Sequence, residues 1–343
     1  MSIAVAIVVL GLLIFLHELG HFLAAKRAGI RVEEFALGFG PKTISKIVGE
    51  TEYSIRMLPL GGFVRVAGTN PEEASFHTDP RGYNRRPLLS RAGFIAAGPA
   101  MNFATSILLF FVLFSVLGLP TPTLVIGSVL PGLAGEEAGL REGDQILSIN
   151  GRQVRSWDEI VGVIQRGLGQ ELVFTVRRAG RLEQVRVVPR ENPQDPSLGY
   201  VGIGPQTAIQ RQGILAGIAS SVRATAAVCV LWIKGIILML LQKIEPDVAG
   251  PVGITQLIGE ATRTGVRNLV YLTAALSANL GILNLLPIPA LDGSRLVFLG
   301  IEAVRGKPVD PEKENLIHLV GFAFLIVLGL VVTYRDLLRL GQM

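Results

Sequence analysis

The feature that most limits the fold of this chain is a set of long apolar stretches. A membrane-spanning helix needs about 20 mostly apolar residues. Four stretches meet this requirement clearly, and they are residues 2–25, 92–118, 269–304 and 316–334. Charged residues make up only 17% of the chain, against about 25% in soluble domains. The surplus of apolar residues therefore indicates contact with lipid, and the fold class we expect is an α-helical polytopic membrane protein.

A fifth stretch, residues 213–241, is apolar enough to span but carries Arg223 and Lys234. A charged side chain near the middle of the bilayer costs about 2.5–3.5 kcal/mol on insertion scales. A helix that lies at the membrane interface lets both basic groups reach water. The local sequence alone leaves both placements open.

Two polar regions separate the apolar stretches. Residues 26–91 contain eleven Lys and Arg against seven Asp and Glu, which predicts a cytoplasmic loop. Within it, residues 52–66 read as two short strands about a glycine turn, which predicts a β-hairpin. Residues 120–206 alternate strand-like runs with one helical stretch, so we expect a small soluble α/β domain on the extracytoplasmic side.

Composition excludes other classes of protein. A single cysteine, Cys229, excludes an internal disulfide framework. The net charge of +5 comes without an arginine-rich run or alternating aromatic and basic residues, so we expect no nucleic-acid partner.

The first apolar stretch contains the sequence His17-Glu18-Leu-Gly-His21. Two histidines four residues apart lie on one face of a helix and can bind one Zn²⁺, while Glu18 activates the metal-bound water. Inside an apolar span these three polar side chains are costly to desolvate unless a metal compensates them. The pattern predicts a zinc site with one ion per chain.

A zinc hydrolase needs a third protein ligand. The metzincin continuation of the motif is absent, because Ala24 and Arg27 occupy the required positions. His77 and His318 have no ligand partners at a useful spacing, and we interpret them as ordinary polar residues. Asp292 is the remaining acid at membrane depth, which makes it a functional candidate. A competing interpretation, an Asp that caps a helix broken by two prolines, is compatible with ligand binding.

The depth of the two motifs links the metal site to the topology. His17 and His21 lie near the cytoplasmic end of the first span, and Asp292 lies near the end of the 269–304 stretch. The two motifs reach the same depth only if 213–241 does not cross the membrane. One metal site therefore predicts four transmembrane helices, with 213–241 on the outer interface.

These motifs together resemble the site-2 protease family of intramembrane zinc metalloproteases, in particular its RseP-like bacterial group. The resemblance rests on the first-span motif, on Gly98-Pro-Ala-Met-Asn102-Phe103, on the pattern at 284–293 and on a PDZ-like stretch at 130–151. It implies that His17, His21 and Asp292 bind zinc and that Glu18 is the general acid/base.

The resemblance also implies four regions of the chain. Residues 1–119 form an N-terminal membrane half with a cytoplasmic or re-entrant hairpin, and 120–206 form an extracytoplasmic PDZ-like domain. Residues 207–268 form an interfacial helix and linker, and 269–343 form a C-terminal membrane half. Family members with two tandem PDZ domains differ from this chain, which has room for one.

The implied function is cleavage of transmembrane segments in the bacterial cytoplasmic membrane, close to its cytoplasmic side. The expected substrates are single-span membrane proteins such as anti-sigma factors or signal-peptide remnants. An extended substrate needs backbone partners where water is scarce; a strand edge near Gly61, Gly62 and Phe63 can supply them, and Asn284 offers a side-chain amide. Two alternatives stay open: a metal-ion transporter with the same ligands, and an inactive scaffold in which the PDZ-like domain acts.

Overall fold

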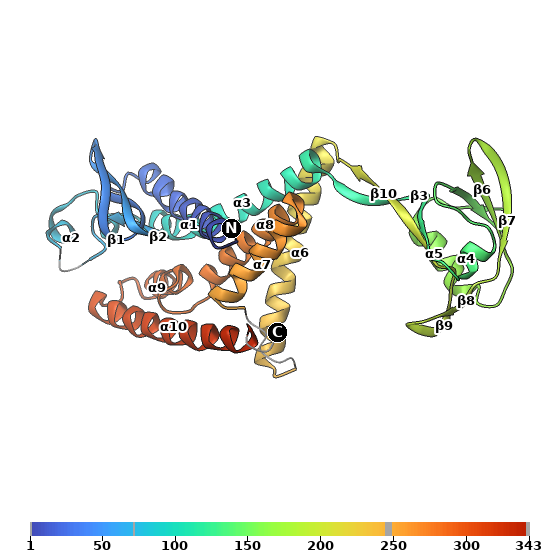
Figure 1. The fold of residues 1–343 in the computed structure, drawn as a ribbon. Coiled ribbons are helices and arrows are strands. Elements are labelled where there is room, and N and C mark those ends of the chain that lie inside the picture. Colours follow the sequence, from blue (N-terminus) through green and yellow to red (C-terminus); the bar gives the residue numbers. More distant parts are fainter. Residues whose placement is uncertain (1, 71–72, 244–248, 341–343) are drawn as a thin grey trace. The chain divides into compact units, whose positions relative to one another are not determined.

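The computed structural model describes residues 2–70, 73–243 and 249–340. The chain divides into two compact units. The membrane unit consists of the two terminal parts of the chain, Met1–Val116 and Gly213–Met343, and the second unit consists of Leu117–Gln212 (Figure 1).

Among the described residues of the membrane unit, five helices are long and apolar enough to cross a membrane. They are α1 (Ser2–Arg27), α3 (Leu88–Phe111, extended by π-helical turns over Val112–Leu117), α6 (Ile214–Leu240), α8 (Val266–Leu285) and α10 (Pro311–Leu340). Most of their large apolar side chains outside the helix contacts are exposed, as lipid-facing surfaces require. The chain is therefore a multi-pass membrane protein.

Helix α3 is the centre of the membrane unit. The Ser277 hydroxyl of α8 donates to the carbonyl of Asn102 at 2.8 Å, and the rings of Phe110 and Tyr271 pack edge to face. The residue numbers rise along α8 as they fall along α3, so the two helices are antiparallel.

The apolar stretch 269–304, predicted as one span, forms two helices separated by a proline-containing loop. Helix α8 ends at Leu285. A short loop that contains Pro287 and Pro289 follows, and the next helix is α9 (Asp292–Arg305). Proline lacks an N–H group and its ring obstructs the preceding turn, so one continuous helix over 269–304 cannot form. The break leaves Asp292 as the first residue of α9. This is the position expected if Asp292 caps a helix that follows the prolines.

The β-structure of the loop between α1 and α3 differs from the predicted hairpin. It consists of β1 (Val32–Val48) and β2 (Thr51–Val66), joined at a turn that contains Gly49. Residues 34–37 pair with 62–65 on one side and with 52–55 on the other. The two halves of 52–66 therefore do not pair with each other, and the prediction of a local hairpin there is wrong. A segment upstream in sequence lies between them, and such pairing leaves no short-range signal.

The remaining elements between α1 and α3 are short, namely α2 (Ala74–Thr78) and the 3-10 turn Tyr83–Arg85. After α6, the helix α7 (Pro251–Thr264) precedes α8. The Asp336 carboxylate of α10 accepts hydrogen bonds from the backbone N–H groups of Gly250 and Gly253, at 3.3 and 2.8 Å. This contact fixes the start of α7 to the last turns of α10. In Figure 1, α6 (yellow) runs crosswise to α10 (red).

The second unit has its own sheet and core. The sheet order is β10-β3-β4-β6-β7, with β5 paired to β4, and β8 and β9 form a separate pair. Its elements are β3 (Leu119–Val129), α4 (Ala134–Glu137), β4 (Gln145–Ile149), β5 (Arg152–Gln153), α5 (Trp157–Arg166), β6 (Leu172–Arg178), β7 (Arg181–Val187), β8 (Arg190–Asn192), β9 (Asp195–Tyr200) and β10 (Ile203–Gln210).

The start of helix α5 is capped by the Ser156 hydroxyl, which accepts from the N–H of Glu159, and the Glu159 carboxylate accepts from the N–H of Arg155. Its buried face packs Trp157, Ile160 and Ile164 against the sheet.

Candidate metal centre

Helix α1 carries the two histidines in its C-terminal half, toward the loop that precedes α3. His17 and His21 are 9% and 7% exposed, and their rings meet edge to face with centroids 4.8 Å apart. The helical repeat places residues i and i+4 on one face, so the local sequence alone produces this pair.

Asp292 completes a triangle with the two imidazoles. Its Oδ2 atom lies 3.2 Å from Nε2 of His17 and 3.3 Å from Nε2 of His21, and the two Nε2 atoms lie 3.2 Å apart. Three corners of a tetrahedron around Zn²⁺ at about 2.0 Å are separated by about 3.3 Å. Within the described part of the chain, this is the one group of three His, Cys, Asp or Glu side chains close enough to hold a metal. The donor set therefore fits zinc.

Hydrogen bonding behind His21 turns its free nitrogen toward the triangle. Nδ1 of His21 lies 2.8 Å from the carbonyl oxygen of Phe94. A carbonyl only accepts, so Nδ1 carries the proton and Nε2 keeps its lone pair. Outer hydrogen bonds of this kind fix the tautomer and orientation of a metal-binding histidine.

Asn102 is the corresponding hydrogen-bond partner of His17. The Nδ2 atom of its side-chain amide lies 3.1 Å from Nδ1 of His17. The nitrogen and oxygen of an amide are assigned from their hydrogen-bond partners. With the two atoms exchanged, Nδ1–H of His17 donates to the amide oxygen and Nε2 is free for a metal. Asn102 thus makes a polar contact between α3 and α1, and its partner is a predicted metal ligand.

Two glycines let α1 and α3 approach closely at the site. A Cβ atom on Gly98 would lie 2.3 Å from His21 Nε2 and 2.8 Å from His17 Cε1. A Cβ atom on Gly20 would lie 2.3 Å from the carbonyl oxygen of Ala97. Any side chain at these positions would displace a histidine or separate the helices.

Glu18 is next to His17 on α1 and faces the β-structure. A Cβ atom on Gly62 would lie 3.4 Å from Cγ of Glu18, and the backbone of Val64 is within hydrogen-bonding reach of the Glu18 carboxylate. The structure therefore brings the predicted acid/base together with the glycine-containing strand.

The other predicted residues lie in different surroundings. Phe63 stacks on Phe39 and lies under the guanidinium of Arg56, and Gly61 packs against Phe39 with φ +101°. Asn284 donates to the carbonyl of Leu280 within its own helix, at 3.1 Å, so this contact does not tie it to the metal-ligand triangle.

Sequence reasoning missed the parts of the site contributed by α3. Gly98 and Asn102 belong to the Gly-Pro-Ala-Met-Asn motif, which could have located the helix beside the histidines. The residue types alone predict neither the close contact of Gly98 with the histidines nor the hydrogen bond from His21 to the carbonyl of Phe94.

Comparison with known proteins gives a consistent assignment. The model of the peptidase family M50 matches residues 5–328. A zinc metalloprotease RasP from Geobacillus kaustophilus is 36% identical, with 98% of this chain and 97% of the relative covered. The regulator of sigma-W protease RasP from Bacillus subtilis is 35% identical, with 97% of each chain covered.

The alignments differ in length. Those with the Geobacillus and Bacillus proteins run over 417 and 412 positions, whereas this chain has 343 residues, so both relatives contain stretches without a counterpart here. The alignment with a zinc metalloprotease of Nostoc sp., 35% identical, runs over 353 positions and covers 99% of this chain and 97% of the relative.

A His-His-Asp triangle with zinc spacing, whose histidines are buried among membrane helices, thus coincides with a family match over nearly the whole chain. The chain belongs to peptidase family M50, the site-2 protease family that its motifs resemble, and it is a membrane zinc metalloprotease.

Proposed function

We propose that this protein is an intramembrane endopeptidase that cleaves the transmembrane segments of single-span membrane proteins. One observation carries the proposal: His17, His21 and Asp292 present three donor atoms 3.2–3.3 Å apart at the depth of the spans. We assign these three residues as the zinc ligands and Glu18 as the general acid/base.

Bound zinc supplies Lewis-acid polarisation of the scissile carbonyl and a water that loses its proton near neutral pH. Glu18 accepts that proton and returns it to the leaving amine. Phe94 and Asn102 keep the histidine lone pairs directed at the metal throughout. The protein groups therefore orient the ligands and move the proton.

A substrate helix must unwind before its peptide bonds become accessible, and its freed backbone groups need partners. We propose that residues 61–63 provide a strand edge for the extended substrate. The contact between Gly62 and Glu18 supports this placement, because a strand added here would run beside the acid/base. Asn284 remains a proposed partner for the unwound backbone.

We propose four transmembrane helices, with α6 at the outer interface. The side chain of His318 contacts the loop before Asp292, and Asp336 contacts the start of α7. Eighteen residues of helix separate them, which is about 27 Å and nearly the thickness of the hydrocarbon core. The start of α7 then lies on the outer side.

Helix α6 begins on that same outer side, because Gly217 packs against Ser115 at the end of α3. The segment between α6 and α7 is too short to recross the bilayer as a helix, and irregular backbone exposed to lipid is not viable. The crosswise direction of α6 in Figure 1 agrees with an interfacial position.

We further propose that the second unit is a PDZ-like domain on the extracytoplasmic side, and that the protein resides in the bacterial cytoplasmic membrane with its active site near the cytoplasm. The lysine and arginine excess of residues 26–91 supports this orientation. Alignment with a full-length relative of similar size supports one such domain. Anti-sigma factors are the substrate class favoured by the name of the Bacillus relative, and signal-peptide remnants are a second class.

The test uses purified protein in detergent with a tagged single-span substrate. Wild type, Glu18→Gln and Asp292→Ala are compared for cleavage and for zinc per chain. We expect cleavage by wild type only, about one zinc in Glu18→Gln and little zinc in Asp292→Ala. A metal-ion transporter needs no general base, so full activity of Glu18→Gln would contradict the protease mechanism. Full zinc and activity in Asp292→Ala would contradict the ligand set.

A further inference from the structure

The loop between α8 and α9, residues 286–291, sets the position of Asp292. Its backbone hydrogen bonds are local turns within residues 283–294, with one exception among the described residues. The exception is the N–H of Ala290, which donates to Nδ1 of His318 on α10 at 3.0 Å. Within the described chain, this bond is the loop's only backbone hydrogen bond to an element other than α8 and α9, the two helices that it joins.

Ala290 adopts a backbone conformation that needs outside support. Its φ is +78°, in the left-handed region that is unfavourable for a residue with a Cβ atom. Such conformations persist where the surroundings fix them. Ala290 is two residues before Asp292, so a change in its conformation would move the carboxylate.

A second contact from α10 holds the same loop. Gly321 packs so tightly on the loop that a Cβ atom there would lie 2.2 Å from Cβ of Pro289. His318 and Gly321 are one helical turn apart, so one face of α10 contacts two successive loop residues.

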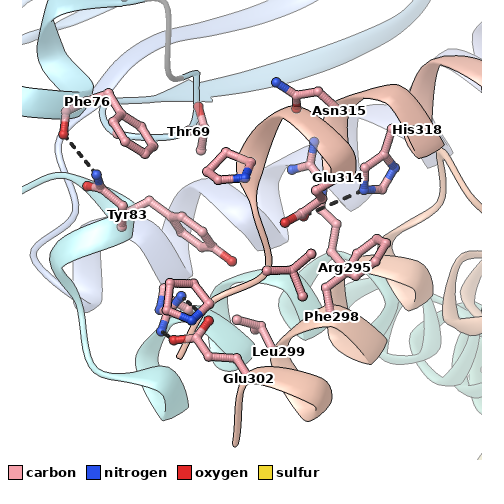
Figure 2. A pocket seen from close by; sticks show the side chains of 16 residues that line it. Thr69, Phe76, Tyr83, Arg295, Phe298, Leu299, Glu302, Glu314, Asn315 and His318 are labelled. Atoms are coloured by element: carbon pink, nitrogen blue, oxygen red, sulfur yellow. Dashed lines mark hydrogen bonds and ion pairs between the residues drawn. The ribbon is translucent and has the colours of Figure 1, made fainter. Parts of the chain in front are cut away.

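The tautomer of His318 follows from its partners. Because Nδ1 accepts the Ala290 N–H, the proton of the neutral ring is on Nε2. Nε2 faces the Glu314 carboxylate, 3.7 Å away. Glu314 and His318 line a cavity of about 290 Å³. Arg295 and Phe298 also line this cavity (Figure 2). The negative charge of Glu314 favours the tautomer that leaves Nδ1 free to accept.

We propose that His318 is a positioning residue for the third metal ligand. It acts through Ala290, whose left-handed conformation it stabilises, and so holds the Asp292 carboxylate within reach of the two histidines. This inference rests on the proposed role of Asp292. It gives the last transmembrane helix a part in the metal centre, although α10 contributes no ligand.

The side-chain chemistry offers a discriminating substitution. Asparagine places an oxygen where histidine has Nδ1, so His318→Asn retains the acceptor for the Ala290 N–H, whereas His318→Ala removes it. Two glycines of α10 give a matched pair for the second contact. Gly321→Ala would push the loop away from α10, and Gly329→Ala has nothing within 4 Å of its new Cβ.

The experiment measures zinc affinity of the full-length protein in detergent by competition with a chromophoric chelator. Loss of an outer-shell partner of a metal site typically weakens metal binding 10- to 100-fold. We expect such a loss in His318→Ala and in Gly321→Ala. We expect His318→Asn and Gly329→Ala to stay within about threefold of wild type, which is below the 10- to 100-fold range expected for a lost partner. Thermal unfolding of each zinc-free variant separates loss of fold from loss of metal.

Two results would overturn the inference. Wild-type affinity in a folded His318→Ala variant would show that the hydrogen bond does not position Asp292. Equal weakening in His318→Ala and His318→Asn would show that the acceptor is not the operative feature. Asp292→Ala is measured alongside, and undiminished affinity in that variant would instead reject the proposed ligand set.

Discussion

Replacement of Gly98 by alanine tests the geometry of the metal centre most directly. Gly98 lies on α3 where this helix contacts both histidines of α1. The added methyl carbon would lie 2.3 Å from Nε2 of His21 and 2.8 Å from Cε1 of His17. Non-bonded heavy atoms prefer about 3.5–4.0 Å, so the methyl group overlaps both imidazoles by roughly 1 Å.

The magnitude follows from the ways in which this overlap can be relieved. Either the helices separate or the imidazoles rotate, and overpacking of this kind costs about 1–3 kcal/mol. Zinc needs both Nε2 atoms in place, so binding must oppose that strain. At about 1.4 kcal/mol per tenfold change, zinc affinity should fall roughly 5- to 150-fold. Cleavage should fall with it at limiting zinc.

The same helix supplies a matched control. Gly93→Ala adds the same methyl group to α3 with nothing within 4 Å. Alanine is a better helix former than glycine by about 0.5–1 kcal/mol, so this variant should bind zinc normally and unfold at the same temperature or higher.

The assay is chelator competition for zinc on purified full-length protein, with thermal unfolding measured on the zinc-free form. A Gly98→Ala variant that binds zinc within about twofold of wild type, below the predicted range, would refute the reasoning. That result would mean that the histidines do not occupy the positions that the contact with α3 assigns to them.

Three further predictions address the surroundings of the site. Asn102→Leu removes the partner of a ligand imidazole and should weaken zinc binding about 10- to 100-fold, as measured by the same competition. Arg91 and Glu302 form a bidentate ion pair between α3 and α9. Reversing either charge should lower the thermal unfolding temperature, and reversing both charges should restore part of that loss. In the second unit, burial alone would raise the pKa of Asp144, but hydrogen bonds from Arg178 and a backbone N–H hold that pKa below its ordinary value. Ionised Asp144 therefore stabilises the folded second unit at neutral pH, and this stabilisation is lost as the pH falls below about 4, the pKa of an unfolded Asp. Amide hydrogen exchange in β6 and β7 should be faster in Asp144→Asn than in wild type at pH 7, and the difference between the two proteins should disappear in acid.

The sequence by itself determined the features that depend on near neighbours along the chain. Helical periodicity places His17 and His21 on one face, and two prolines end α8 just before Asp292. The cost of burying three polar side chains among apolar residues pointed to a metal. Alternating strands in 120–206 also anticipated the β-structure of the second unit.

The tertiary structure alone decided which distant segments meet. The local hairpin predicted at 52–66 was wrong because residues 34–37 insert between its two halves, and pairing between distant strands is not encoded in the alternation of either strand. The role of Asn102 behind His17 and the tight fit of Gly98 depend on how α3 crosses α1. His318, an ordinary polar residue in the sequence, gains its contact with the Asp292 loop only when α10 packs beside that loop. Local sequence features determine which residues can act as ligands and where the helices end. The orientation of each ligand depends on contacts between distant segments that meet only in the folded chain.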